Sequence, residues 1–193
     1  MALFSRLMRY LGLQQRKQEE RPAERLYQSV LRASRQPDLY IEFDLRDHLD
    51  SRFDMLCLHI SLLMGRLRML PEDLYKPLNQ ELFDRFFADM DFTLREMGVG
   101  DLGVGKRVRK MSEAFMGRLT AYSVALEQKN KPALALALAR NVRRSEGCTE
   151  ADRHMADYVM TCRERLAVVS DEKLQMGTVD LIVVLALRED YHD

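Results

Sequence analysis

The sequence predicts an all-α fold: a single compact domain of about six to seven helices, with an N-terminal amphipathic helix. Apolar residues recur three and four positions apart along most of the chain, which is the period of a helix. Ser, Thr or Pro stands at the start of several of these stretches, where helix N-termini favour such residues. At 193 residues the chain has the length of one domain and buries enough surface to fold without disulfides.

Residues 1–21 form the predicted amphipathic segment, and residues 22–193 form the predicted helical domain. In the first segment the apolar side chains share one helical face and the cations lie off it. A basic helix of this kind is able to lie in a membrane interface; a helix docked on its own domain or a frayed terminus is the alternative. The residues assigned to the membrane surface are Leu3, Phe4, Arg6, Leu7, Arg9 and Leu11.

The first half of the helical domain contains three expected helices. One covers about residues 23–35 and ends before Pro37. Alternating apolar residues over 39–45 leave a short extended segment or a packed loop open. Ser51 is expected to cap a helix over about 51–70, whose His59 is interpreted as structural because no metal-binding partners accompany it. After Pro71, which starts a turn or the next helix, a phenylalanine-rich helix covers about 80–97.

The second half continues in the same way. A long helix is expected to run to about residue 128, and Pro132 opens a helix over 132–145. Thr149 is expected to cap the next helix. Ser170 and Asp171 are expected to cap a last, buried helix that includes the β-branched run near the C-terminus, since a lone strand there has nothing to pair with.

The most unusual stretch is residues 89–111, where an amphipathic helix leads into a glycine-rich junction. Four glycines precede a dense group of cations, and ordered glycines are costly unless the backbone needs shapes that a Cβ forbids. We interpret this junction as the partner-binding site. Its assigned residues are Gly98, Gly100, Asp101, Gly103, Gly105, Lys106, Arg107, Arg109 and Lys110.

Two nucleotide-binding patterns overlap in this junction. Residues 98–103 fit GxGxxG, and residues 100–106 fit the GxxxxGK of a phosphate-binding loop. The first pattern needs a preceding strand, whereas the spacing here predicts a helix. The second needs Ser or Thr after the lysine, and Arg107 stands there instead. A turn between helices with glycine C-caps is the competing interpretation.

Composition narrows the class of protein. The 30 Lys and Arg residues balance the 30 Asp and Glu residues, which argues against a DNA-binding protein that works by bulk positive charge. Three cysteines without a CxxC motif predict reduced, partly buried thiols. No secretory signal is recognisable, and the longest apolar run, at residues 181–187, is too short to cross a bilayer.

No catalytic constellation emerges from the sequence. The four histidines form no HExxH motif and no pairing with cysteine at metal-ligand spacing. The carboxylates around residues 84–96 lack the ExxH spacing of a di-iron bundle. The sequence therefore predicts neither an enzyme nor a bound cofactor or metal.

Two segments carry a resemblance to a known family. RFDMLCLHISLLMGRL at residues 52–67 and LFDRFFADMDFTLREMGVGDLGVGKRVRKMSEAFMGRL at residues 82–119 resemble the ubiquinol–cytochrome c chaperone family. The string LREMGVGDLGVGKRV is the most specific part, and the compact start of the chain indicates a bacterial-type member.

The resemblance implies a function. It implies an all-helical, non-enzymatic chaperone that binds newly made cytochrome b and supports assembly of the ubiquinol–cytochrome c oxidoreductase (bc1) complex. It also implies a place at the inner face of the cytoplasmic membrane, or the matrix side of the mitochondrial inner membrane in a eukaryote. Mitochondrial members work with a small partner subunit near the ribosomal exit tunnel. The cations of the junction then have three candidate ligands: lipid head groups, ribosomal RNA or acidic loops of a partner.

Overall fold

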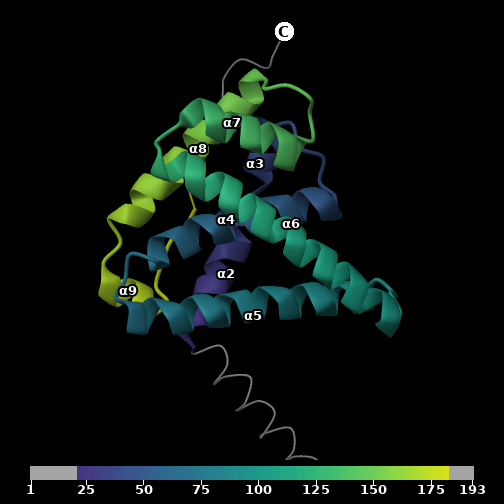
Figure 1. Cartoon of the computed structure of the whole chain (residues 1–193), viewed down its shortest axis with the longest axis horizontal. Helices are drawn as coiled ribbons and strands as arrows, with labels where there is room; N and C mark the ends of the chain where they lie inside the picture. The colour runs from purple at the N-terminus through teal and green to yellow at the C-terminus, as the bar shows by residue number, and fades with distance from the viewer. Residues whose placement is uncertain (1–20, 183–193) are drawn as a thin grey trace, which may run out of the picture.

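The computed structural model describes residues 21–182, and every regular element in that range is helical (Figure 1). The predicted all-α class is therefore confirmed. The elements are α2 (Pro22–Ser34), α3 (Pro37–Glu42), α4 (Leu49–Leu67), α5 (Glu72–Glu96), α6 (Asp101–Glu127), α7 (Lys131–Leu138), the π-helical turn η1 (Ala139–Arg143), α8 (Glu150–Ala167) and α9 (Asp171–Gln175). Two of these, α3 and α9, are short, and they bring the number of α-helices in this range slightly above the expected six to seven.

Helix α4 is the central element of the domain. Residues 53–64 are buried on every face of the helix, which is the pattern of a helix enclosed by protein rather than lying on a surface. It packs against α2, α5, α6, α8 and η1. Figure 1 shows α6 crossing α4 diagonally, with α5 below and α7 and α8 at the other end.

Helices α5 and α6 are the longest elements, and they meet at a corner. We define this corner as residues 97–110, from the C-cap of α5 through the first turns of α6. It lies at the right-hand end of the molecule in Figure 1, where no other helix lies beside it. Leu94 of α5 and Val104 of α6 are both buried at this end, outside the main core cluster.

Of the N-caps predicted for α8 and α4, the first is confirmed and the second is not. Thr149 caps α8 with a reciprocal capping box, in which Asp152 Oδ2 accepts from the Thr149 backbone N–H at 2.7 Å. The predicted cap of α4 was wrong, because His48 occupies that position and its Nδ1 accepts from the Ser51 backbone N–H at 3.2 Å. Imidazole nitrogen satisfies an unpaired helix N–H in the same way as a hydroxyl oxygen.

Three segments differ from the sequence prediction. Residues 37–42 form a helix rather than a strand or loop, because the helix buries Leu39 and Phe43 while Ile41 points to solvent. Helix α5 starts at Glu72 and continues through Pro77, since Leu74 and Leu78 pack on the core one turn apart. Within the described residues the expected last helix covers Asp171–Gln175 and residues 178–182 are not helical, whereas the rest of the predicted helix lies outside them.

Gly177 explains why the last helix stops early. It has a φ of +73°, and a Cβ there would lie 2.5 Å from the carbonyl oxygen of Pro22. The chain therefore turns sharply against the start of α2 at a position that only glycine fits. Residues 1–20, including the predicted membrane-surface residues, and residues 183–193 lie outside the described part of the chain.

Candidate functional site

An apolar hollow lies where α4, α6 and α8 end. It has a volume of about 600 Å³. Leu58 and Leu62 of α4, Leu126 of α6 and Met160 of α8 contribute apolar walls, and Met69 at the margin is 73% exposed. We call this hollow the α4/α6/α8 groove. A mostly apolar concave site of this size is the usual form of a binding site in a helical domain.

Two arginines fix the walls of the groove relative to one another. Arg66 of α4 donates from Nε to the Leu166 carbonyl at 3.1 Å and from Nη2 to the Val169 carbonyl at 2.7 Å. Arg163 of α8 donates from Nη1 to the Leu126 carbonyl at 2.6 Å. Each guanidinium thus satisfies carbonyls at the C-terminal end of a neighbouring helix, where the helix dipole favours a cation.

Gly65 leaves the groove open from the α4 side. It lies within α4, it lines the groove, and a Cβ built on it would meet no atom within 4 Å. Sequence reasoning missed this groove because its walls come from three distant segments. A glycine inside a strongly apolar helix was the available signal, since such a glycine often marks a packing or functional need.

The corner differs in detail from its sequence prediction. Gly98 has a φ of +79° and ends α5 in a Schellman motif, with its N–H bonded to the Arg95 carbonyl at 2.9 Å and the Val99 N–H to the Leu94 carbonyl at 3.1 Å. Gly100 is the N-cap of α6. Gly103 and Gly105 were expected to need unusual backbone shapes, and this was wrong, because both lie inside α6 with negative φ.

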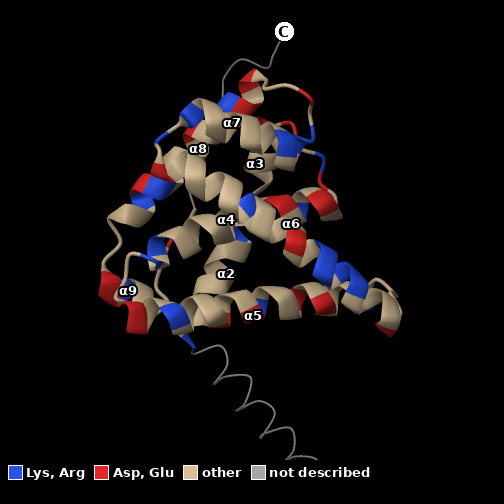
Figure 2. Ribbon diagram, in the orientation of Figure 1, with Lys and Arg blue, Asp and Glu red and all other residues tan. Residues whose placement is uncertain are grey.

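The charged residues of the junction are brought together on one helix. Asp101, in the first turn of α6, pairs with Arg95 of α5. Lys106, Arg107, Arg109 and Lys110 are all exposed on α6 (Figure 2). Arg109 Nε lies 3.2 Å from Glu113 Oε1, and both side chains are mostly exposed. The assignment of these residues to partner binding stays a prediction.

The structural context of a nucleotide-binding loop is missing in the described range. A helix leads into the glycines and a helix leads out of them, with no strand in residues 21–182. The competing interpretation, a helical corner with a glycine C-cap, is confirmed at Gly98.

Buried ionisable groups in the core have structural partners. Asp54 of α4 is fully buried, accepts from Arg118 Nη2 at 2.7 Å and from Arg144 Nη2 at 3.1 Å. Burial raises the pKa of Asp54 to about 6 even with these two cations beside it. These two interactions join α4 to α6 and to Arg144, which follows η1. No cavity described in residues 21–182 opens onto Asp54.

His59 is a structural histidine, as its sequence context indicated. It is buried, its Nδ1 lies 2.7 Å from the Met55 carbonyl oxygen, and its Nε2 lies 2.6 Å from the Tyr158 hydroxyl. Burial lowers the pKa of His59 to about 4, so the ring is neutral at pH 7. The three cysteines are free thiols, as expected.

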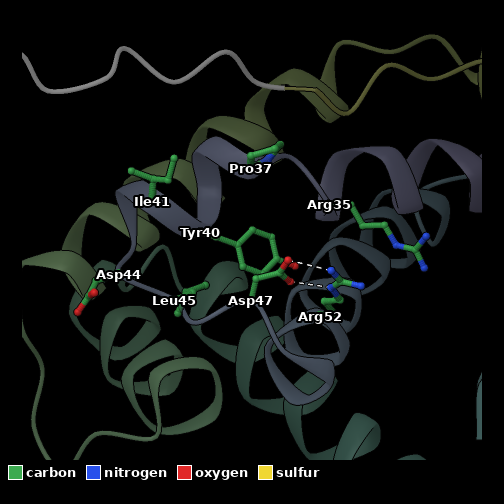
Figure 3. A pocket seen from close by; sticks show the side chains of 8 residues that line it. All are labelled: Arg35, Pro37, Tyr40, Ile41, Asp44, Leu45, Asp47 and Arg52. Atoms are coloured by element: carbon green, nitrogen blue, oxygen red, sulfur yellow. Dashed lines mark hydrogen bonds and ion pairs between the residues drawn. The ribbon is translucent and has the colours of Figure 1, made fainter. Parts of the chain in front are cut away.

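A second hollow, of about 500 Å³, lies around α3. Figure 3 shows Tyr40 beside an ion pair in which Arg52 donates to both carboxylate oxygens of Asp47, at 2.6 Å and 2.8 Å. Burial raises the pKa of Tyr40 to about 12, so its hydroxyl stays protonated and donates to the Ser34 carbonyl at 3.0 Å. The polar groups here satisfy one another rather than a ligand.

These features define a class of protein. Within residues 21–182 no group of three or more His, Cys, Asp or Glu side chains is placed to hold a metal ion. No helix in the same range combines the length and apolarity needed to span a bilayer. Residues 21–182 form an all-helical arrangement with an apolar groove and a basic corner, which is the form of a binding protein.

Comparison with known proteins gives the family. The family model described as "Ubiquinol-cytochrome C chaperone" matches residues 42–181, and the chain belongs to that family. A crystal structure of the Cbp3 homolog from Brucella abortus is similar, with 38% sequence identity and a TM-score of 0.74, covering 89% of this chain and 97% of that chain. A sequence comparison with curated proteins gives no match.

Proposed function

We propose that this protein is a non-enzymatic assembly chaperone that holds newly made cytochrome b during assembly of the bc1 complex. Membership of the ubiquinol–cytochrome c chaperone family supports this role, as does the likeness to the Brucella Cbp3 homolog. The observation that carries the proposal is the α4/α6/α8 groove, because a chaperone for a membrane protein needs an apolar surface that is accessible before the client is assembled.

The groove fits a helical client segment. Cytochrome b is a bundle of hydrophobic helices, and a helix with an apolar face is commonly recognised by an apolar groove on a helical partner. Met69 and Met160 lie at the margin and wall of the groove, and unbranched methionine side chains adapt to apolar partners of different shape. Arg68 and Lys129 at the rim suit polar or acidic residues next to such a segment.

Filling the groove tests its role. In the variant Gly65→Phe the new Cβ meets no neighbouring atom within 4 Å and the ring is added to a residue that lines the groove, so newly made cytochrome b should co-purify at least tenfold less efficiently. The matched control is Gly117→Phe in α6, where a Cβ also has open space but does not line the groove. Retention of cytochrome b by the folded Gly65→Phe protein would exclude the groove as the client site.

The role in assembly has a separate test. Deleting the gene should lower the amount of assembled bc1 complex while cytochrome b is still translated. Blue native electrophoresis with a cytochrome b antibody measures both quantities. Normal bc1 levels in the deletion strain would contradict the proposed function.

The remaining partner predictions belong to the same proposal. We propose a peripheral location at the inner face of the cytoplasmic membrane, where the client is inserted. A small partner subunit and a ribosome contact are inferred from mitochondrial members only. Co-purification from cells with and without a translation inhibitor distinguishes a ribosome contact from a stable partner subunit.

A further inference from the structure

The corner between α5 and α6 carries an unusual amount of exposed apolar surface. Leu102 is 98% exposed, Phe92 is 61% exposed and Met97 is 55% exposed. A single exposed apolar residue on a soluble protein needs no explanation. Three large ones at one end of the molecule, with a nearly naked leucine at the turn itself, indicate a contact surface.

Unpaired positive charge lies directly beside these residues. Among the ion pairs of the described residues, none involves Lys106, Arg107 or Lys110. Asp101, the nearest carboxylate, is already paired with Arg95. Residues 103–112 contain four cations and no acidic residue. Arg109 pairs with Glu113 one turn later, so the positive charge that no ion pair of the described residues neutralises comes from Lys106, Arg107 and Lys110.

The exposed leucine and two of the cations lie on the same outward face of α6. Lys106 and Arg109 follow Leu102 by four and seven positions, which places all three on one helical face. Val104 and Phe115 lie on the opposite face and are buried against α5. The outward face of α6 therefore has a leucine at its end and cations one and two turns behind it, as Figure 2 shows for the charges.

The corner lies at one end of the molecule. It forms the right-hand end of the molecule in Figure 1, and neither of the two hollows described here includes its residues. The Schellman motif at Gly98 fixes the turn, and Leu94 and Val104 are buried beside it, outside the main core cluster. A fixed end with an exposed apolar residue at its tip suits a lipid surface better than a shaped groove in a partner protein.

We propose that the α5–α6 corner docks the protein on an anionic lipid surface. Leu102 and Met97 enter the boundary between head groups and acyl chains, and Lys106, Arg109 and Lys110 lie against lipid phosphates. This is the arrangement of peripheral membrane segments, in which apolar burial and attraction to anionic lipid act together. An RNA site would use the cations but would leave the exposed leucine without a role, because single-stranded RNA stacks on aromatic or guanidinium planes.

A tryptophan at the apex tests the proposal locally. The chain contains no tryptophan, so Leu102→Trp gives one fluorescence signal in the full-length protein. With vesicles of phosphatidylcholine and phosphatidylglycerol its emission should shift to the blue, and brominated acyl chains should quench it. Neutral phosphatidylcholine vesicles should give neither effect. The control probe is Ile41→Trp on α3, a site 73% exposed, whose emission should not change.

Charge reversal tests the electrostatic part. Each cation near an anionic surface contributes about fivefold to membrane partitioning, so Lys106→Glu/Lys110→Glu in the Leu102→Trp background should weaken vesicle binding at least about 25-fold. The control Arg140→Glu/Arg153→Glu makes the same change in net charge at two exposed positions elsewhere. It should weaken binding far less.

Several outcomes would overturn the proposal. The first is an unshifted Leu102→Trp emission on vesicles to which the protein is bound. Equal shifts of the two tryptophan probes, or equal effects of the two charge reversals, would also contradict it. The last is a shift of the Leu102→Trp emission with polyuridylate but not with vesicles. The first would place the membrane contact on another segment, such as residues 1–21, and the last would indicate RNA. None of these measurements uses the client, so they remain distinct from the test of the groove.

Discussion

At the scale of single residues, His59 links the core to pH. Its ring is buried between the Met55 carbonyl and the Tyr158 hydroxyl, and burial lowers its pKa to about 4 from an ordinary value of 6.5. Between these values the unfolded chain binds a proton that the folded chain does not, so the free energy of unfolding rises with pH across that window.

We therefore expect acidification to act through His59. Lowering the pH from 7 to 4.5 should remove about 2 kcal/mol of stability from this group, measured by urea unfolding at each pH. The variant His59→Gln has no titrating group at this position, so its free energy of unfolding should fall by about 2 kcal/mol less than that of the wild type over the same pH range. Parallel pH profiles for the two proteins would show that the ring stays accessible to protons in the folded state. Asp54, whose pKa is raised to about 6 by burial, acts with the opposite sign in both proteins and cancels in the comparison.

At the scale of elements, glycines that look alike in the sequence have different roles in the structure. The cluster at 98–105 contains one glycine with positive φ, Gly98, and two ordinary helical ones. The strictest requirement lies outside the cluster, at Gly177, where the chain passes against Pro22. A contact with a residue more than 150 positions away leaves no local signal in the sequence.

Alanine substitutions separate these roles. Gly177→Ala should lower the free energy of unfolding by at least about 2 kcal/mol, because it combines positive φ with an overlap of the new Cβ and the Pro22 backbone. Gly105→Ala should raise it by about 0.5–1 kcal/mol, because the site is helical, exposed and open. Thermal or urea unfolding measures both changes. Equal effects of the two substitutions would contradict the assignment.

Helical periodicity predicted the long elements well. The helices α2, α4 and α8 were expected near their observed bounds, because their apolar residues recur at the helical period and their ends carry Pro or Thr. For α6 only the end near residue 128 was predicted, since the helix begins at Asp101, within the glycine cluster. Periodicity failed for α3, whose apolar residues at 39 and 43 suit a helix and whose residues at 41 and 45 suit a strand. Packing of Leu39 and Phe43 into the core decided the outcome.

At the scale of the whole molecule, the groove exists only because three helices pack together. Its walls come from residues near 60, 125 and 165, and each wall is an ordinary amphipathic helix in the sequence. Only the packing of α6 and α8 around α4 brings three helix ends together and leaves space at Gly65. The basic corner, by contrast, is local in sequence, and for that reason the sequence did indicate its cations, although not its exposed apolar apex.

Because helix packing creates the groove, the contacts that join its walls should affect its shape more than the wall residues themselves do. Arg163 makes such a contact by donating to the Leu126 carbonyl at 2.6 Å. Arg163→Met keeps the apolar stem but removes the charged hydrogen bond, so the free energy of unfolding should fall by about 2 kcal/mol. The end of α6 should then separate from α8 and exchange its amide hydrogens faster at residues 124–128.

The same loosening should reduce retention of cytochrome b, because the groove then has one mobile wall. Arg153→Met is the matched control, since Arg153 lies on the same helix, is exposed, and its side chain forms no hydrogen bond or ion pair within residues 21–182. It should change stability by less than about 0.5 kcal/mol. If Arg163→Met kept both its exchange pattern and its client, helix capping across the groove would be incidental, and the walls would be held by apolar packing alone.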